Sequence, residues 1–438
     1  MNYSVMLITI FALLYVLNVP TTYILSLINH RSSLYTLLSL LLPFVTPLFV
    51  FLIGSPRLPD SQEYVPFVDV CWYRMSNKKS PMVITSSVGG STKVDWPVVI
   101  PKMYESLKQH ERMTRRVTKS NGYYVFEDCE MDIDYHMNFC DAELSKEEYV
   151  KKINELKGLD LDENRPLWKI IIFPNVENSW RMVVKISHCL VDGLTAVRLM
   201  QEVAEASNLE LNDYNESKYH FLEINKEIAK LAALTLSKQP KGIWTRVKRI
   251  SLIPIYMLRV FFAKNDTVKC LRKKLSGKQQ CFWGKMSSVD SVKEVAKQFG
   301  GNLNTLLFSC MADTFSEVVK EKGGDETEVN FYVAANLRMY EPKIQFGNKI
   351  GLLLMSLPLD NKNLKTRFET IKGRLETAKN SMEAYVYYVV QSVIGIFPDW
   401  IQALGIKIVE RKATLNVTTV PGFKEPLNFF GSKVDDVM

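Results

Sequence analysis

The sequence predicts an α/β protein that is long enough for two lobes and begins with a transmembrane helical hairpin. Runs of β-branched residues, such as residues 182–186, lead into stretches where apolar residues recur at helical spacing, such as residues 194–206. The 438 residues are 47% hydrophobic and 23% charged, which is a globular composition. A chain of this length has room for two cores. The hairpin is predicted by the scarcity of charge in the first 56 residues.

Strand and helix patterns alternate after the hairpin. β-branched and aromatic runs predict strands at residues 67–73, 82–86, 123–126, 169–173, 182–186, 329–334 and 350–357. Helical spacing predicts helices at residues 97–116, 146–156, 194–206 and 287–299, and a further helix that begins at Asn304-Thr305. The strands at 169–173 and 182–186 should pair, because only a short polar turn at 175–179 separates them.

The membrane hairpin rests on two charge-free runs, residues 1–29 and 32–56, which only His30-Arg31 interrupts. Each run is long enough to cross about 30 Å of hydrocarbon as a helix. The alternative is a pair of buried core helices. The basic residues that follow the second run, Arg57, Arg74, Lys78 and Lys79, outnumber Arg31 in the turn, which favours a cytosolic main domain. Seven scattered cysteines without a Cys-x-x-Cys pair fit a reducing compartment.

The net charge of +8 is concentrated in one segment. Residues 238–278 hold twelve Lys and Arg and one acid, a net of +11, which leaves −3 for the remaining residues. Aromatic side chains such as Trp244, Phe261 and Phe262 are interleaved with these basic residues, a pattern typical of contact with anionic lipid headgroups. A solvated linker between two lobes is the alternative. No nucleic-acid-binding module pattern accompanies the segment, so nucleic acid is not an expected partner.

A His-x-x-x-Asp-Gly motif at residues 188–193 is the main candidate for a catalytic site. It follows the strand at 182–186 and precedes the helix at 194–206, so His188 should lie at a strand end and Asp192-Gly193 should open the helix. A histidine facing a cleft there can act as a general base near neutral pH. The alternative is structural: a packed histidine, an aspartate N-cap and a turn glycine.

Three motifs in register carry a resemblance to a known family. They are Asp-x-Asp-Tyr-His at 132–136, Leu-Asp-x-x-x-Pro-Leu-Trp at 161–168 and the motif at 188–193. Together they resemble the wax ester synthase/diacylglycerol acyltransferase family, and more broadly the acyltransferases built like chloramphenicol acetyltransferase. Asn304-Thr305, Asn336-Leu337-Arg338 and Thr419-Val420-Pro421-Gly422 extend the similarity from about Pro66 to the C-terminus. The chain departs from the family pattern at Ser187, Thr305 and Thr419, where the family has His, Asp and Asn.

The resemblance implies a chloramphenicol-acetyltransferase-like fold of two lobes, each a mixed sheet with helices. We therefore expect a membrane anchor at residues 1–56, an N-terminal lobe at 57–237, a basic crossover at 238–280 and a C-terminal lobe at 281–438. The charge-free segment 384–398 is then either a core helix or part of an acyl-chain channel. A membrane location follows from the hairpin, and its charge bias favours a catalytic domain that faces the cytosol. The expected membrane is the endoplasmic reticulum, although the sequence itself does not identify the organelle.

The activity implied by the resemblance is transfer of an acyl group from acyl-CoA to a lipid alcohol, either a long-chain alcohol or diacylglycerol. His188 would be the general base, and Asn304 would stabilise the oxyanion. Asp192 and Gly193 would hold the turn, with an ion pair from Asp192 to an arginine such as Arg338. The expected substrate-binding residues are Pro166, Leu167, Trp168, His136 and Arg338. Acyl-CoA is a co-substrate, membrane lipids are expected partners, and neither a cofactor nor a metal is expected.

Two other functions remain open at this point. The chain could be an inactive lipid-binding or scaffold relative, or an acyltransferase for a sterol or a short alcohol. The presence of both His188 and Asp192-Gly193 favours an enzyme. Cys189 is a poor candidate nucleophile, because consecutive residues of an extended segment project to opposite faces and cannot form a Cys-His pair. Direct transfer without an acyl-enzyme is therefore expected.

Overall fold

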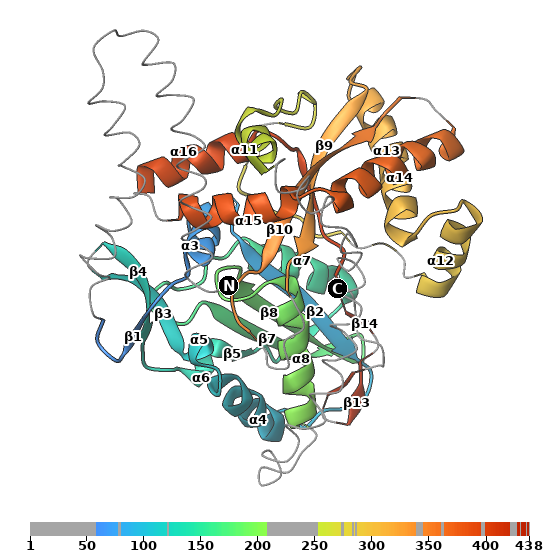
Figure 1. Ribbon diagram of the computed structural model, residues 1–438. Helices are drawn as coiled ribbons and strands as arrows, with labels where there is room; N and C mark the ends of the chain where they lie inside the picture. Colours follow the sequence, from blue (N-terminus) through green and yellow to red (C-terminus); the bar gives the residue numbers. More distant parts are fainter. Residues whose placement is uncertain are drawn as a thin grey trace, which may run out of the picture.

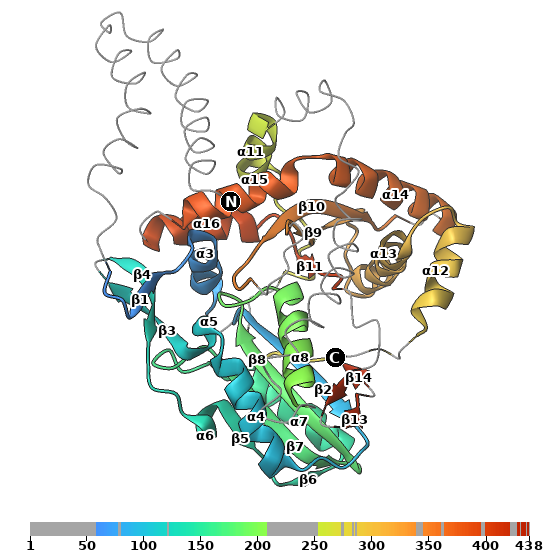
Figure 2. The same cartoon turned by 60° about the horizontal axis from the view of Figure 1, so that its bottom comes forward.

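The computed structural model describes residues 58–437 except 78–79, 121, 208–252, 273–275, 283, 285–286, 339–344, 361–362, 396–398, 421–426, 430 and 435. Two lobes, each a sheet flanked by helices, lie one above the other in Figure 1 and again in Figure 2. The predicted two-lobed α/β architecture is therefore confirmed. The predicted hairpin at 1–56 and the first part of the crossover, 238–252, lie outside the described residues.

The first lobe is built on a six-stranded mixed sheet with the order β14-β2-β8-β7-β5, in which β6 also pairs with β7. Its strands are β2 (Val83–Gly90), β5 (Met137–Phe139), β6 (Glu143–Leu144), β7 (Trp168–Val176), β8 (Ser179–Ser187) and β14 (Asp436–Val437). The predicted pairing of β7 with β8 is confirmed, and it is antiparallel. Glu177 and Asn178, both at positive φ, make the turn between them.

Both faces of this sheet are buried, which explains the unbroken apolar runs of its strands. Ile170 and Ile172 face one core, with α4 (Trp96–Lys108) and α8 (Gly193–Ser207). Ile171 and Phe173, on the opposite face, pack with α7 (Lys146–Lys157). A smaller antiparallel sheet, β1-β4-β3, lies beside this lobe. It comprises β1 (Gln62–Tyr64), β3 (Arg115–Ser120) and β4 (Tyr123–Asp128), and the short helices α5 (Glu111–Thr114) and α6 (Ile133–His136) lie nearby along the chain.

The second lobe has a three-stranded mixed sheet, β10-β9-β11, also covered on both faces. Its elements are α11 (Ile253–Phe262), α12 (Val289–Gln298), α13 (Leu303–Glu321), β9 (Glu328–Asn336), β10 (Ile350–Pro358), α14 (Leu364–Asn380), α15 (Glu383–Ile394), α16 (Asp399–Glu410) and β11 (Leu415–Val417). α13 and α14 pack on one face with Phe331 and Leu353, while α11 and α15 cover the other with Tyr332 and Leu354. The segment 384–398 thus supplies a core helix, α15.

Two segments cross between the lobes, contrary to the predicted boundaries. Residues 67–73 form helix α3 (Phe67–Met75), so the predicted strand is wrong, and α3 packs on α15 and α16 of the second lobe. The end of the chain returns to the first lobe: β14 extends its sheet beside β2. The hairpin of β12 (Asn428–Phe429) and β13 (Ser432–Lys433) joins it, with Phe429 in the first core. The predicted range 281–438 therefore does not form the second lobe alone.

The described residues include no helix that is both long enough and apolar enough to cross a bilayer.

Gly351 offers a test of the packing between β10 and α15. A Cβ at this position would lie 2.1 Å from the carbonyl oxygen of Ala384, a backbone atom that cannot move aside cheaply. We expect Gly351→Ala to lower the free energy of unfolding by about 1–3 kcal/mol, measured by thermal or denaturant unfolding. Gly373→Ala is the control: Gly373 lies on the exposed face of α14 with nothing within 4 Å of its Cβ position. That change should leave stability unaltered or raise it by up to about 1 kcal/mol. Equal losses in the two variants would contradict this account.

Candidate active site

His188 lies at the end of β8, as the motif predicts. Ser187 is the last residue of the strand, and the backbone N–H of His188 donates to the Met82 carbonyl at 2.8 Å. Helix α8 begins at Gly193, and Oδ1 of Asp192 accepts a hydrogen bond from the Thr195 N–H at 3.0 Å. Asp192 thus caps the helix while the histidine stands at the strand end.

Asn348, on the other lobe, holds the imidazole. Oδ1 of Asn348 lies 2.8 Å from Nδ1 of His188, while its Nδ2 donates to the His188 carbonyl at 2.6 Å and to Oδ1 of Asp69 at 2.8 Å. Because Nδ2 is engaged as a donor, the amide presents its oxygen to the ring, so Nδ1 carries the proton. The other ring nitrogen, Nε2, is left as a hydrogen-bond acceptor for a substrate.

Asp69 and Trp72, both on α3, complete the support of His188. Asp69 is buried and accepts hydrogen bonds from the Asn348 backbone N–H at 2.8 Å and from Nη1 of Arg112 at 2.9 Å. The Trp72 ring stacks on the imidazole, with 4.1 Å between centroids and 10° between planes. Burial raises the pKa of Asp69, against the lowering effect of Arg112 and Asn348. Asn348 therefore fixes the ring of His188 within its plane, and Trp72 packs against one face of the ring.

The surroundings keep His188 neutral. Desolvation lowers the pKa of its imidazole from the usual 6.5, although Asp192 and the bond to Asn348 act in the opposite direction. The residue as a whole is partly exposed. Burial raises the pKa of the neighbouring Cys189 thiol to about 12. A neutral imidazole beside an un-ionised thiol suits general-base chemistry and disfavours a thiolate nucleophile.

A buried ion pair between Asp192 and Arg338 joins the two lobes, as the sequence predicts. Nε and Nη2 of Arg338 lie 3.0 and 2.8 Å from Oδ2 of Asp192, and Nη2 also donates to the Gly347 carbonyl at 2.5 Å. The Lys349 N–H donates to the same carboxylate oxygen at 3.2 Å. Arg338 is buried, so its position favours holding Asp192 over contacting a substrate directly.

Gly193 lies against Val420, near the end of the chain, whereas Asn304 lies in α13 of the second lobe. A Cβ on Gly193 would lie 3.0 Å from Cγ2 of Val420, so the family-like segment 419–422 contacts the His-x-x-x-Asp-Gly motif through Val420. Pro421 and Gly422 of that segment lie outside the described residues. Asn304 is partly exposed in the first turn of α13, which Asn302 caps through the Thr305 N–H at 3.1 Å. Among the described residues, no hydrogen bond joins Asn304 to His188.

The remaining predicted substrate-binding residues, Pro166, Leu167, Trp168 and His136, are buried in the first lobe. Nδ1 of His136 lies 2.9 Å from the Trp168 carbonyl, the two rings stack at 4.3 Å, and burial lowers the pKa of His136 to about 4. The Leu167 carbonyl accepts the Ser187 N–H at 2.9 Å, one residue before His188. Their geometry therefore supports the end of β8.

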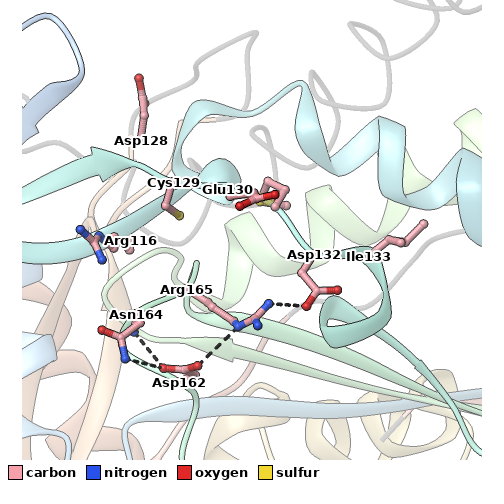
Figure 3. Close-up of a pocket in the computed structure, with 10 residues that line it drawn as sticks. Arg116, Asp128, Cys129, Glu130, Asp132, Ile133, Asp162, Asn164 and Arg165 are labelled. Atoms are coloured by element: carbon pink, nitrogen blue, oxygen red, sulfur yellow. Dashed lines mark hydrogen bonds and ion pairs between the residues drawn. The ribbon is translucent and has the colours of Figure 1, made fainter.

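Asp132 and Asp162, one from each of the two upstream motifs, line a polar pocket that does not include His188 (Figure 3). Nη1 of Arg165 donates to Asp132 at 2.6 Å, and Nε of Arg165 lies 3.4 Å from Asp162. The Asp162 N–H donates to the Tyr135 hydroxyl at 2.9 Å. Arg165 is thus paired with both acids, and these contacts connect the N-terminal end of α6 to the loop before β7.

Sequence reasoning missed Asn348, Asp69 and Trp72 as site residues. Gly347-Asn348 reads only as a turn before a strand, yet Gly347 has φ +87°, and a Cβ there would lie 2.6 Å from both Arg112 Nη1 and Asp69 Oδ2. The signal for Asp69 was a single acid inside the apolar run 67–73. Neither signal indicates its partner.

Comparisons with known proteins agree with this architecture. The family model described as the wax ester synthase/diacylglycerol acyltransferase catalytic domain matches residues 82–307, and the WS/DGAT C-terminal domain matches residues 346–438. A probable diacylglycerol O-acyltransferase of Mycobacterium tuberculosis is 22% identical over 310 residues, which cover 67% of this chain and 65% of the relative. The chain thus spans about two thirds of that relative's length. The O-acyltransferase WSD of Acinetobacter baylyi is 20% identical over 400 residues, 84% of each chain.

Solved structures show the same fold. The wax ester synthase/diacylglycerol acyltransferase from Marinobacter aquaeolei VT8 has a TM-score of 0.55 and 16% identity, with 86% of each chain covered. The starter condensation domain of rhizomide synthetase, solved with C8-CoA, has a TM-score of 0.55 and 11% identity over 85% of this chain and 82% of that one.

The buried ion pair predicts a large stability effect. Arg338→Leu leaves the Asp192 carboxylate buried without its cation, so we expect the free energy of unfolding to fall by about 3–5 kcal/mol, measured by denaturant unfolding. Lys293→Leu removes an exposed partner of Asp290 and should change it by less than about 1 kcal/mol. A loss in Arg338→Leu no larger than in Lys293→Leu would refute this role.

Proposed function

Because the chain belongs to the wax ester synthase/diacylglycerol acyltransferase family, we propose that it transfers an acyl group from acyl-CoA to the hydroxyl of a lipid alcohol. The acceptor is a long-chain alcohol or diacylglycerol, and the product is a wax ester or triacylglycerol. The single observation that carries the proposal is the imidazole of His188, which lies where the two lobes meet and whose Nδ1 proton is directed to Asn348 at 2.8 Å. Such a ring is prepared to accept a proton at Nε2.

His188 acts twice in the proposed reaction. Nε2 takes the proton of the acceptor hydroxyl while its oxygen attacks the thioester carbonyl carbon. The tetrahedral intermediate then collapses, the carbon–sulfur bond breaks, and the imidazolium returns the proton to the CoA sulfur, whose thiol pKa is near 8.5. The products are the ester and free CoA. The bond from Nδ1 to Asn348 keeps the same tautomer through both steps.

The oxyanion of the intermediate needs a hydrogen-bond donor. Asn304 remains our proposed donor, because it lies in the first turn of α13, where backbone N–H groups also point outward from the helix. The acyl-CoA and the acceptor approach from the two lobes that meet at His188. Holding both substrates there contributes up to about 7–11 kcal/mol through proximity.

The proposed enzyme is bound to a membrane. The charge-free runs at 1–29 and 32–56 support anchoring, and the basic residues that follow them support a catalytic domain on the cytosolic side. The membrane we propose is that of the endoplasmic reticulum. A membrane location suits the substrates, since long-chain alcohols and diacylglycerol partition into lipid.

Loss of the base should nearly abolish turnover. We expect His188→Ala to lower kcat by about 10²–10⁴-fold, measured with purified full-length protein, labelled acyl-CoA and a panel of long-chain alcohols, diacylglycerol, a sterol and short alcohols. Cys189→Ala is the control and should retain activity, because direct transfer uses no thiolate. Equal ester formation by wild type and His188→Ala would overturn the proposal. No ester with any acceptor would instead support a non-catalytic relative.

The pH profile should report His188 and its partner. The neutral imidazole is the active form and its pKa lies below 6.5, so kcat/KM should fall as the pH drops through a value below 6.5. Asn348→Ala removes a bond that raises this pKa, so the acid limb should move to still lower pH while kcat falls by about 10²-fold through lost orientation. An acid limb that stays in place in Asn348→Ala would contradict this link.

A further inference from the structure

Two helices of the second lobe present apolar side chains to solvent. On α11, Ile255, Leu258 and Phe262 are exposed at positions i, i+3 and i+7, which lie on one side of a helix. On α16, Trp400 and Leu404 are exposed at i and i+4. Phe262 is 79% exposed and Trp400 71%, which is far more than packing in a core would leave. These five residues are called the docking face below.

The two helices that carry the docking face meet near their C-terminal ends, where Nζ of Lys412 donates to the Ala263 carbonyl. α11 and α16 contact each other and lie side by side in Figures 1 and 2. Their other sides are packed: Val260 of α11 is buried in a core cluster, and the partly buried Val409 of α16 packs against the same cluster. Exposed large apolar side chains on two neighbouring helices mark a candidate interaction site.

The first described residues of the chain lie near the N-terminal end of α16. The second run ends at Pro56, and β1 begins at Gln62 and pairs with β4. On β4, the Tyr124 hydroxyl donates to Oδ1 of Asp399 at 3.3 Å, and Asp399 directly precedes Trp400. A hairpin anchored in a bilayer would therefore bring the N-terminal end of α16 close to the lipid.

The charges around the docking face suit an anionic surface. Lys264 follows α11, and Lys407 lies one turn beyond Leu404 on α16; both are exposed. Of the acids nearby, Asp399 is paired with Lys119 at 2.7 Å and Arg74 at 3.7 Å, and Asp266 accepts hydrogen bonds from the Asn330 and Thr414 N–H groups. Glu410 lies one turn beyond Lys407 on α16. Trp, Phe, Leu and Ile beside Lys are typical of helices that lie in the plane of a membrane interface.

We infer that the docking face lies on an anionic lipid bilayer and forms a second membrane contact besides the N-terminal runs. This inference rests on the membrane attachment in the proposed function and adds the surface that faces the lipid. The side chains of Trp400 and Phe262 enter the headgroup–acyl boundary, while Lys264 and Lys407 remain at the level of the phosphates.

The test places Trp400 next to a quencher in the lipid. Full-length protein is reconstituted in vesicles of phosphatidylcholine and phosphatidylglycerol, with and without phosphatidylcholine brominated on the upper acyl chain. The emission of Trp400 is obtained by subtracting the tryptophan emission of Trp400→Phe from that of the wild type. We expect brominated lipid to quench this emission completely. Phe262→Asp combined with Leu404→Asp should restore Trp400 emission. Phe282→Asp is the control, because Phe282 is 86% exposed but lies outside both helices, and Trp400 should stay quenched.

Ester formation from acyl-CoA and diacylglycerol is measured in the same vesicles, so the two proposals can fail separately. Unquenched Trp400 in vesicle-bound protein that forms ester overturns the docking inference and leaves the proposed function standing. A second copy of the chain, or its own first 57 residues, lying over the face would produce that result. Quenched Trp400 in protein that forms no ester supports docking and counts against the proposed function.

Discussion

The buried ion pair between Asp192 and Arg338 is the interaction on which the site depends. Removing two charges from water is costly, so this pair is favourable only with near-ideal geometry and further hydrogen bonds. Here the Thr195 and Lys349 N–H groups complete the shell of Asp192, and the Gly347 carbonyl accepts from Arg338. The pair thereby ties the start of α8 to the segment that carries Asn348. His188 receives its partner only when the two lobes meet in this register.

The long strands of both sheets could be predicted because their signals are local. The pair β7 and β8 is apolar on both faces and joined by a short turn, so neither its strands nor their pairing needs distant information. Helix α3 was not predictable in this way. Phe67–Met75 is rich in β-branched and aromatic residues, which favour a strand, yet it forms a helix. Pro66 precedes it at φ −53°, and packing against α15 and α16 overrides the weak local preference. The return of β14 to β2, two residues long and nearly 350 residues away in sequence, carries no local signal at all.

The residues of the candidate site also differ in whether neighbouring sequence predicts them. The motif placed His188 at a strand end and Asp192 at a helix start because both positions follow from neighbouring residues. Asn348 and Asp69 lie 160 and 119 residues from His188 in the chain, and only the fold brings them together. Pro166, Leu167 and Trp168 stood out as a motif, but a motif does not distinguish a residue that contacts substrate from one that holds the strand beside it. Burial makes that distinction, and it favours the second role for all three.

Helix α3 connects the chemistry of the proposed reaction with the proposed membrane contact. One side of α3 supplies Trp72, stacked on the imidazole, and Asp69, bonded to Asn348. The rest of α3 packs on α15 and α16, and α16 carries Trp400 on its exposed side. α3 therefore lies between the imidazole and α16. The proposed lipid acceptor is largely apolar and the CoA moiety of acyl-CoA is polar, so the two proposals together place the approach of the acceptor on the side of the docking face and that of acyl-CoA on the aqueous side of the lobe junction.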